Sequence, residues 1–208
     1  MRGLYPIIDL DSLTALKLDP LEFAHAVLTA RPELVQLRAK HASPRETLTL
    51  LRALRPACTR AGSLLFANDR PDLALLADCD GVHVGQDDLS VTEVRRIGPR
   101  LRIGVSTHNP VELEQALQAK PSYVAFGPVF ATRSKGNPDP VVGFEALLDA
   151  AQRARAAGCA LVAIGGVDLE HASQIQSAEI AGAVIGGLLP PDGDIEKVAT
   201  LAQSLQSA

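Results

Sequence analysis

Eight short apolar runs recur along the chain, separated by longer segments in which apolar residues lie three and four positions apart. A continuous apolar run is typical of a strand covered on both faces, as in a parallel sheet, and the wider spacing is typical of a helix with one buried face. Ser43, Asn109 and Asp168 stand before such segments as typical helix caps. The pattern therefore predicts parallel strands, each followed by a helix. The expected strands are Leu4–Ile8, Leu34–Leu37, Leu64–Ala67, Gly81–Val84, Leu101–Val105, Tyr123–Phe126, Ala160–Ile164 and Ala183–Ile185.

A chain of 208 residues divided among eight such units leaves 26 residues for each, close to the minimum for a strand, a helix and two short loops. No break in composition divides the chain, so we expect one domain, residues 1–208, that folds as a (β/α)8 barrel of the α/β class. The alternative is an open doubly wound sheet. Such a sheet binds ligands at one switch point, whereas a barrel draws site residues from the ends of many strands.

Charge and hydropathy argue against several classes of protein. The formal net charge is −4, whereas a nucleic-acid-binding protein is expected to carry a basic face. No apolar run approaches the roughly 18 residues of a membrane-spanning helix, and the N-terminus lacks the pattern of a signal peptide. We therefore expect a soluble, cytoplasmic protein that binds small molecules and neither nucleic acid nor membrane. The sequence does not determine its oligomeric state.

Polar side chains gather where the predicted strands end. After the second strand, alternation places Gln36, Arg38 and Lys40 on one face, which points into the barrel mouth if the strand continues. Two cations and an amide converging there would suit a polyphosphate. A strand end with solvated charges would give the same pattern.

Carboxylates follow the next two strands. Asn68 and Asp69 come directly after the third strand, and Asp88 comes shortly after the fourth. By itself the Asn–Asp pair could cap the following helix. Two carboxylates and an amide on neighbouring strands, close to two cations, also suit Mg²⁺ with a diphosphate, because Mg²⁺ takes few carboxylate oxygens together with phosphate oxygens and water. We interpret His83, in the middle of the fourth strand, as a core-packing residue.

The remaining strand ends carry hydroxyls and glycines. Ser106 follows the fifth strand, where its hydroxyl could bind a substrate or form the next turn. A loop after the sixth strand holds Thr132, Ser134 and Lys135 and could act as an anion-binding lid. Paired glycines follow the seventh and eighth strands, where such barrels often hold a phosphate through backbone N–H groups, although any tight turn also favours them. These pairs are Gly165–Gly166 and Gly186–Gly187.

Taken in order, these segments resemble the thiamine phosphate synthase family, which shares a superfamily with the thiazole tautomerases. The family's run is Q-L-R-x-K, N-D, H-x-G-Q-x-D, G-x-S-x-H, G-P-x-F-x-T-x-[TS]-K and A-I-G-G, and each segment has a counterpart here, from Tyr5 to Gly187. The resemblance implies a (β/α)8 barrel and a transferase of thiamine biosynthesis (EC 2.5.1.3). Such an enzyme joins 4-amino-2-methyl-5-hydroxymethylpyrimidine diphosphate to 4-methyl-5-(2-phosphoethyl)thiazole, giving thiamine phosphate and diphosphate.

The resemblance also implies a role for each site residue. Mg²⁺ and the cationic side chains would neutralise the departing diphosphate, so that the C–O bond breaks before the thiazole nitrogen attacks the pyrimidine cation. The catalytic residues would be Arg38, Lys40, Ser106 and Lys135. The pyrimidine diphosphate would be bound by Gln36, Arg38, Lys40, Asn68, Ser106 and Lys135. Mg²⁺ would be bound by Asp69 and Asp88. The thiazole phosphate would be bound by Thr132, Ser134, Gly165, Gly166, Ile185 and Gly186.

Three positions depart from the family's pattern. Ala39 stands where an acidic residue usually separates the Arg from the Lys, and Gly186 stands where a serine is common. Pro6 lies where the first strand would normally donate a hydrogen bond, which suits the start of a strand or an irregularity. These departures bear on substrate affinity more than on the type of reaction.

Two other functions fit parts of the pattern. A thiazole tautomerase would carry a catalytic His after the Phe-Gly of the sixth strand, where this chain has Pro128. Relatives of that kind also tend to lack the carboxylates present here as Asp69 and Asp88. A barrel that binds a phosphate ligand without catalysis would not need both carboxylates and the set of cations. The synthase is therefore the favoured interpretation.

Overall fold

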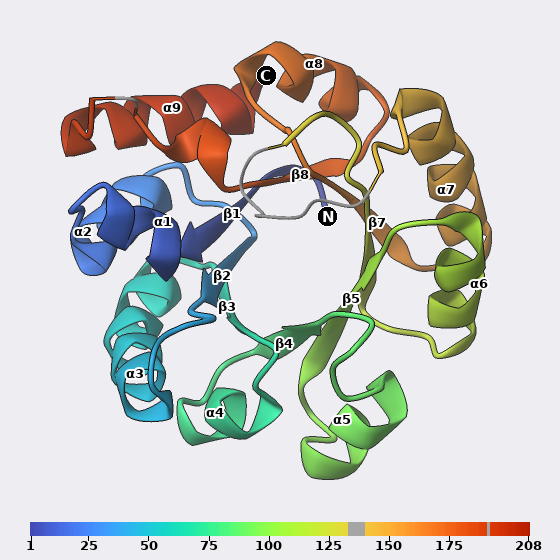
Figure 1. The fold of residues 1–208 in the computed structure, drawn as a ribbon, viewed down its shortest axis with the longest axis horizontal. Coiled ribbons are helices and arrows are strands. Elements are labelled where there is room, and N and C mark those ends of the chain that lie inside the picture. The colour runs from blue at the N-terminus through green and yellow to red at the C-terminus, as the bar shows by residue number, and fades with distance from the viewer. Residues whose placement is uncertain (133–139, 191) are drawn as a thin grey trace.

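The computed structural model describes residues 1–132, 140–190 and 192–208. Within these ranges, eight strands pair in chain order, β8 pairs with β1, and every pair is parallel, so that the sheet closes (Figure 1). This arrangement confirms the predicted (β/α)8 barrel and excludes the open doubly wound sheet. The strands are β1 (Gly3–Asp9), β2 (Leu34–Arg38), β3 (Leu64–Asn68), β4 (Gly81–Val84), β5 (Arg102–Thr107), β6 (Tyr123–Phe126), β7 (Ala160–Ile164) and β8 (Ala181–Val184).

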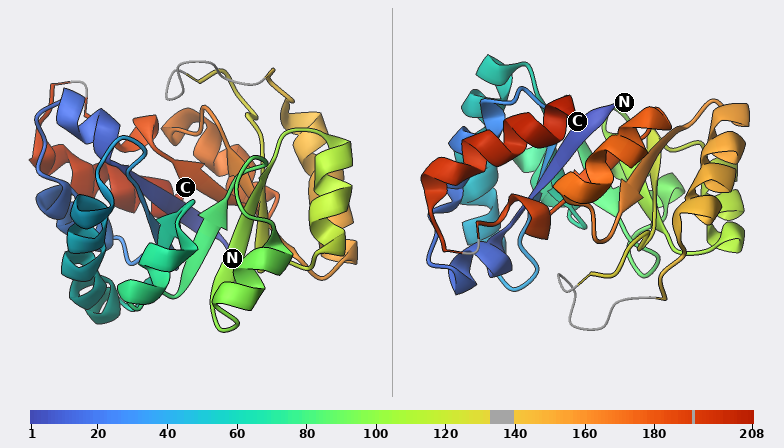
Figure 2. Two further views of the ribbon diagram at one scale, coloured as in Figure 1. Left: turned by 60° about the horizontal axis from the view of Figure 1, so that its bottom comes forward. Right: turned by 90° about the horizontal axis from the view of Figure 1, so that it is seen from above.

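Helices follow the strands and form a ring around them (Figure 1), and the turned views show the helices on the outside of the sheet (Figure 2). Ser43, Asn109 and Asp168 each accept a hydrogen bond from the first turn of the following helix, as their sequence context predicts. Within the described ranges, no helix is long and apolar enough to cross a membrane. The helices are α1 (Leu10–Ala15), α2 (Pro20–Leu28), α3 (Pro44–Ala61), α4 (Pro71–Leu76), α5 (Val91–Ile97), α6 (Pro110–Gln118), α7 (Phe144–Ala156), α8 (Leu169–Ser177) and α9 (Ile195–Ser207), with a 3₁₀ turn, η1 (Gly186–Leu188).

Two apolar cores hold the barrel together. The larger lies between the strands and the helices and consists mostly of Leu, Val, Ile and Ala side chains. The smaller fills the inside of the barrel and contains the rings of Tyr5, Phe66 and Tyr123. Because the interior is packed rather than open, ligands have to bind at the rim above this inner core.

Two of the large inner rings lie over strand glycines. Gly81 pairs with Phe66 in the register of β3 and β4, and a Cβ on Gly81 would lie 2.4 Å from the Phe66 ring. Gly104 lies in register between His83 of β4 and Tyr123 of β6, and its Cβ would lie 2.1 Å from Cζ of Tyr123. Since protein interiors are close-packed, the missing side chains of the two glycines provide the space that these rings occupy.

Pro6 lies inside β1 rather than at its start. The register of β1 with β8 runs from Gly3 to Pro6, and its register with β2 begins at Ile7. The proline therefore stands where β1 changes its pairing partner. A missing N–H interrupts the ladder least at such a point.

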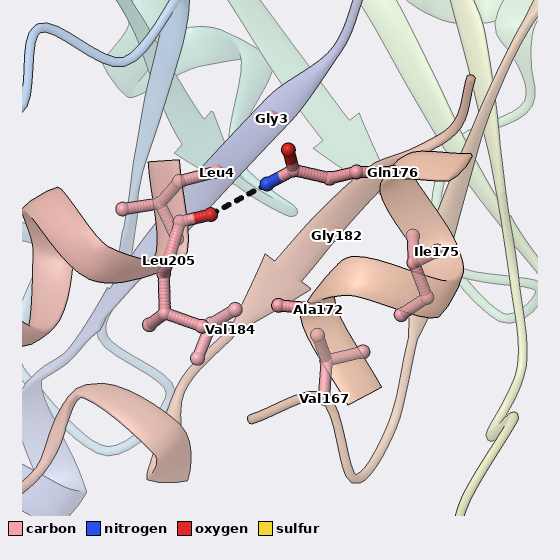
Figure 3. Close-up of a pocket in the computed structure, with 9 residues that line it drawn as sticks. All are labelled: Gly3, Leu4, Val167, Ala172, Ile175, Gln176, Gly182, Val184 and Leu205. Carbon is pink, nitrogen blue, oxygen red and sulfur yellow. Dashed lines mark hydrogen bonds between the residues drawn. The ribbon is translucent and has the colours of Figure 1, made fainter. Parts of the chain in front are cut away.

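Helices α8 and α9 pack against β1 and β8 around a small apolar cavity (Figure 3). Its volume is about 10 Å³, which is room for at most one water molecule. Gln176 Nε2 donates to the Leu205 carbonyl oxygen at 2.7 Å and so ties α8 to the end of α9. Val167 and Gly182 line the cavity, which is too small to hold a substrate.

Candidate active site at the barrel mouth

A cavity of about 500 Å³ opens at the rim where the strands end. In a parallel barrel the carboxyl ends of all strands meet at one rim, so side chains that follow different strands come together there. Many of the residues predicted for the site line this cavity. They are Gln36, Arg38, Lys40, Asn68, Asp69, Asp88, Ser106 and Ile185.

Asp69 and Asp88 are neighbours at this rim, and Lys40 lies beside them. Lys40 Nζ is 2.9 Å from Asp69 Oδ2, and Asp88 Oδ2 accepts a hydrogen bond from Gly85 N at 2.7 Å. Burial is the main cause that raises the pKa of Asp88, and the Asp69 carboxylate raises it further. The two carboxylates therefore repel each other, which is the situation that a divalent cation relieves.

The backbone at Asp69 turns the chain at the rim. Its φ of 61° is left-handed, a conformation that is uncommon in residues other than glycine, although Asp and Asn adopt it more readily than most. Its N–H donates to the His83 carbonyl oxygen at 2.7 Å, which extends the contact between β3 and β4 past Asn68. After this turn, the Asp69 carboxylate lies beside Lys40.

The donor set at the rim fits Mg²⁺ only in combination with a ligand. Among the residues that the structure describes, no group of three or more His, Cys, Asp or Glu side chains could hold a metal ion. Asp69 and Asp88 would supply two carboxylates, and the other positions would be filled by phosphate oxygens and water. Mg²⁺ accepts this combination, because it usually keeps several waters and binds one or two carboxylates together with substrate phosphates.

Arg38 contacts a carboxylate that the sequence analysis missed. Asp9, at the end of β1, is 3% exposed and accepts hydrogen bonds from Arg38 Nη1 and from the backbone and hydroxyl of Ser12. Asp11 Oδ2 lies 3.9 Å from the same Nη1. These contacts hold the guanidinium at the rim. A signal was present, since Asp9 directly follows the first apolar run, but Asp9 also caps α1, and a cap explains such a residue without a site.

Gln36 and Ser106 are the two ends of a chain of hydrogen bonds on the floor of the cavity. The chain passes through Tyr5, Tyr123 and His83. The sequence interpretation of His83 as a core-packing residue is therefore incomplete. The ring is buried, but each of its nitrogens lies 2.8 Å from a hydroxyl oxygen.

The described residues predicted for the thiazole phosphate follow β6, β7 and β8, which lie on the opposite side of the barrel from β2, β3 and β4. Gly165 and Gly166 have φ of 89° and 67°, and a Cβ on Gly166 would lie 2.5 Å from the Ala131 carbonyl oxygen. The left-handed turn and the close packing of the segment after β6 both require glycine here. Gly186 begins the 3₁₀ turn η1. Thr132 is the last residue described before the first gap, and the predicted site residues Ser134 and Lys135 lie outside the described residues.

Comparisons with a family model, with relatives of known name and with solved structures all point to the same family. Residues 4–188 match the family model described as thiamine monophosphate synthase. The thiamine-phosphate synthase of Koribacter versatilis is 44% identical over 194 residues, covering 89% of this chain and 88% of the relative. That of Chlorobium luteolum is 40% identical over 184 residues, covering 88% of this chain and 85% of the relative. Among solved structures, thiamine phosphate pyrophosphorylase from Pyrococcus furiosus superimposes with a TM-score of 0.85 and 29% identity, covering 99% of this chain and 94% of the other.

Proposed function

The chain belongs to the thiamine monophosphate synthase family, and we propose that its mouth cavity carries out the family's reaction by a Mg²⁺-assisted dissociative displacement. It is a thiamine-phosphate synthase (EC 2.5.1.3), a transferase of thiamine biosynthesis that condenses a pyrimidine diphosphate with a thiazole phosphate. The tautomerase and the non-catalytic phosphate-binding barrel are set aside, because the relatives named above are synthases.

Arg38 and Lys40 bind the diphosphate of the pyrimidine substrate. Asp9 already holds the Arg38 guanidinium, so Arg38 loses little conformational freedom when the anion binds. Lys40 contacts Asp69 and can exchange that carboxylate for a phosphate oxygen at the same rim. Other residues assigned to this substrate are Gln36, Asn68, Ser106 and Lys135.

Asp69 and Asp88 would hold Mg²⁺, whose charge would stabilise the diphosphate as it departs. Their proximity supports this assignment, since burial and the Asp69 carboxylate raise the pKa of Asp88. Two acidic groups held together in this way favour a bound cation over the free pair.

The displacement begins with cleavage of the C–O bond between the pyrimidine methylene carbon and the diphosphate. The electron pair leaves with the diphosphate, and Arg38, Lys40 and Lys135 neutralise its growing charge. The amino group of the pyrimidine stabilises the remaining cation, and the thiazole nitrogen attacks that cation to form the new C–N bond. No enzyme nucleophile is required, so catalysis rests on neutralising charge and on holding the two substrates in line.

The thiazole phosphate binds at the rim after β6, β7 and β8. Gly165, Gly166 and Gly186 would offer their backbone N–H groups to the phosphate at this rim. Gly186 offers no hydroxyl, where a serine is common in the family, but keeps its N–H. Other residues assigned to this phosphate are Thr132, Ser134 and Ile185.

The observation that carries this proposal is that Arg38, Lys40, Asp69 and Asp88 line one cavity. Its test is the conversion of both substrates by the purified chain with Mg²⁺, with EDTA, and with excess Mg²⁺ added back. We expect equal amounts of thiamine phosphate and diphosphate, loss of both in EDTA, and recovery with Mg²⁺. An unchanged rate in EDTA would remove the metal from the mechanism, and absence of diphosphate release under all conditions would refute the proposal.

A further inference from the structure

A chain of side-chain hydrogen bonds crosses the floor of the mouth cavity from β2 to β5. Gln36 Nε2 donates to Tyr5 Oη, which lies 2.7 Å from Tyr123 Oη. Tyr123 Oη lies 2.8 Å from His83 Nδ1, and His83 Nε2 lies 2.8 Å from Ser106 Oγ. Gln36, Tyr5 and Tyr123 are at most 2% exposed, and His83 is 6% exposed. The links between the two ends are therefore shielded from bulk water.

The packing of the barrel makes this chain possible. Tyr123 and His83 stand two strands apart, with Gly104 between them in register. Any side chain at Gly104 would collide with the Tyr123 ring, because a Cβ would lie 2.1 Å from its Cζ. The Tyr123 ring stacks on the His83 ring at 5.6 Å between centroids and meets the Tyr5 ring edge-on at 5.8 Å. The rings are thus positioned by packing as well as by hydrogen bonds.

The links from Tyr5 to Ser106 could each run in either direction, and a single direction follows when every buried proton of the chain is given an acceptor. The amide nitrogen of Gln36 is a donor only, so it donates to Tyr5. Tyr5 then donates its single proton to Tyr123, and Tyr123 donates its own to His83 Nδ1. A neutral imidazole that accepts at Nδ1 carries its proton on Nε2 and donates to Ser106 Oγ. Burial raises the pKa of both tyrosines, so both phenols keep their protons.

This direction decides what the two ends offer to the cavity. Ser106 accepts from His83, so its own hydroxyl proton is available as a donor. Gln36 uses its amide nitrogen on Tyr5, which leaves Oε1 as an acceptor. Within the described residues, every fully buried side-chain oxygen has a hydrogen-bond partner. Gln36 makes its hydrogen bond through the amide nitrogen, so Oε1 is not fully buried and lies at the surface of the cavity that Gln36 lines.

We propose that Tyr5, Tyr123 and His83 are positioning residues that set the hydrogen-bond polarity of Gln36 and Ser106 and thereby select a 4-aminopyrimidine ring over its 4-oxo counterpart. This inference rests on the proposed assignment of Gln36 and Ser106 to the pyrimidine substrate. A 4-aminopyrimidine presents an amino donor and ring-nitrogen acceptors. The amino group matches the acceptor Oε1 of Gln36, and a ring nitrogen matches the hydroxyl donor of Ser106. In the 4-oxo ring, an oxygen replaces the amino donor and a ring nitrogen carries a proton, so both matches are lost.

Tyr123→Phe tests this proposal with a small change, because it removes one buried oxygen and keeps the ring. We expect KM for the pyrimidine diphosphate to rise about 10-fold, the equivalent of one buried hydrogen bond. The preference for this substrate over its 4-oxo diphosphate counterpart, measured as a competitive inhibitor, should fall by about the same factor. KM for the thiazole phosphate should not change.

Thr107→Val is the matched control. Thr107 is 1% exposed, follows Ser106 on β5, and donates through Oγ1 to the Ala125 carbonyl oxygen at 3.0 Å, outside the chain. This variant also loses one buried, hydrogen-bonded hydroxyl, and it should keep the KM for the pyrimidine diphosphate and the ring preference. If Tyr123→Phe does not fold, Tyr5→Phe breaks the chain one link earlier and should give the same result. A lower kcat with unchanged ring preference in the tyrosine variant would indicate a merely structural role and overturn the proposal.

The proton on His83 provides an independent measurement on the unmodified protein. Nitrogen-15 NMR of the labelled imidazoles should show His83 as the neutral Nε2–H tautomer, and His83→Asn identifies its signals among those of the five histidines. The opposite tautomer, with the proton on Nδ1, would reverse the chain and overturn the inference. A wild-type protein that forms no thiamine phosphate would count against the proposed function instead, so the two failures are distinguishable.

Discussion

Gly104→Ala should damage this barrel far more than the addition of one methyl group suggests. Its Cβ would lie 2.1 Å from Cζ and 2.3 Å from Oη of Tyr123. The Tyr123 ring has little room to move away, because it is 2% exposed and packs against the rings of Tyr5, Phe66 and His83. Either the strand or the ring therefore has to shift.

The cost follows from these contacts. Overpacking of a core by an added methyl group costs about 1–3 kcal/mol. A displaced Tyr123 ring also loses its hydrogen bonds to Tyr5 at 2.7 Å and to His83 at 2.8 Å, each worth about 1 kcal/mol net. We expect the free energy of unfolding to fall by about 3–5 kcal/mol, a large fraction of the roughly 5–15 kcal/mol typical of a folded protein.

Urea denaturation of the two glycine variants Gly104→Ala and Gly182→Ala measures this difference. Gly182 is also a strand glycine, but it faces the small cavity of Figure 3, and its Cβ would lie 3.0 Å from Val167 Cγ1. We expect Gly182→Ala to change stability by less than about 1 kcal/mol, since a small adjustment of Val167 makes room. Combining Gly104→Ala with Tyr123→Leu should recover much of the loss in a double-mutant cycle. Equal midpoints for the two glycine variants would refute the argument.

Four further predictions concern the rim. Asp69→Ala and Asp88→Ala should each abolish turnover without changing the circular dichroism spectrum, and a near-normal rate in either variant would remove that carboxylate from the metal site. Because burial and the Asp69 carboxylate raise the pKa of Asp88, Mg²⁺ competes with a proton there. The Mg²⁺ concentration for half-maximal rate should therefore rise as pH falls through that raised pKa, and a requirement that is flat with pH would contradict this. The raised pKa also means that the folded, metal-free protein binds the Asp88 proton more tightly than the unfolded chain does. The stability that this proton contributes is therefore lost as pH rises through the raised pKa. Asp88→Asn should accordingly raise the urea midpoint at neutral pH in the absence of Mg²⁺. Asp9→Asn should raise KM for the pyrimidine diphosphate about 10-fold by releasing Arg38, with KM for the thiazole phosphate unchanged, and equal KM values in wild type and variant would show that Asp9 does not position Arg38.

The strands could be predicted from local pattern, because a strand covered on both faces is apolar whatever its neighbours are. The predicted ends are less accurate. The fifth strand is expected at Leu101–Val105 and is observed at Arg102–Thr107. Ser106 and Thr107 belong to it through pairing with Ala125 and Phe126 of β6, and the polar character of these two residues hides that pairing from an apolar pattern.

The cations and carboxylates at the mouth could also be anticipated, because parallel strands bring their carboxyl ends to one rim. Arg38, Lys40, Asp69 and Asp88 all line the cavity as expected. Asp9 was missed because a carboxylate directly before a helix is usually a cap. The roles of Ser134 and Lys135 stay predictions, since both lie outside the described residues.

The sequence by itself determined the number and order of the strands and, with them, that polar residues after different strands share one rim. Only the tertiary structure decided which side chains meet beneath that rim. Tyr5, His83 and Tyr123 belong to apolar runs and look like packing residues in the sequence. Their contact depends on the register across β4, β5 and β6, on closure of the barrel, and on the space left by Gly104. Register and closure arise from packing between distant segments, so local sequence patterns do not reveal them.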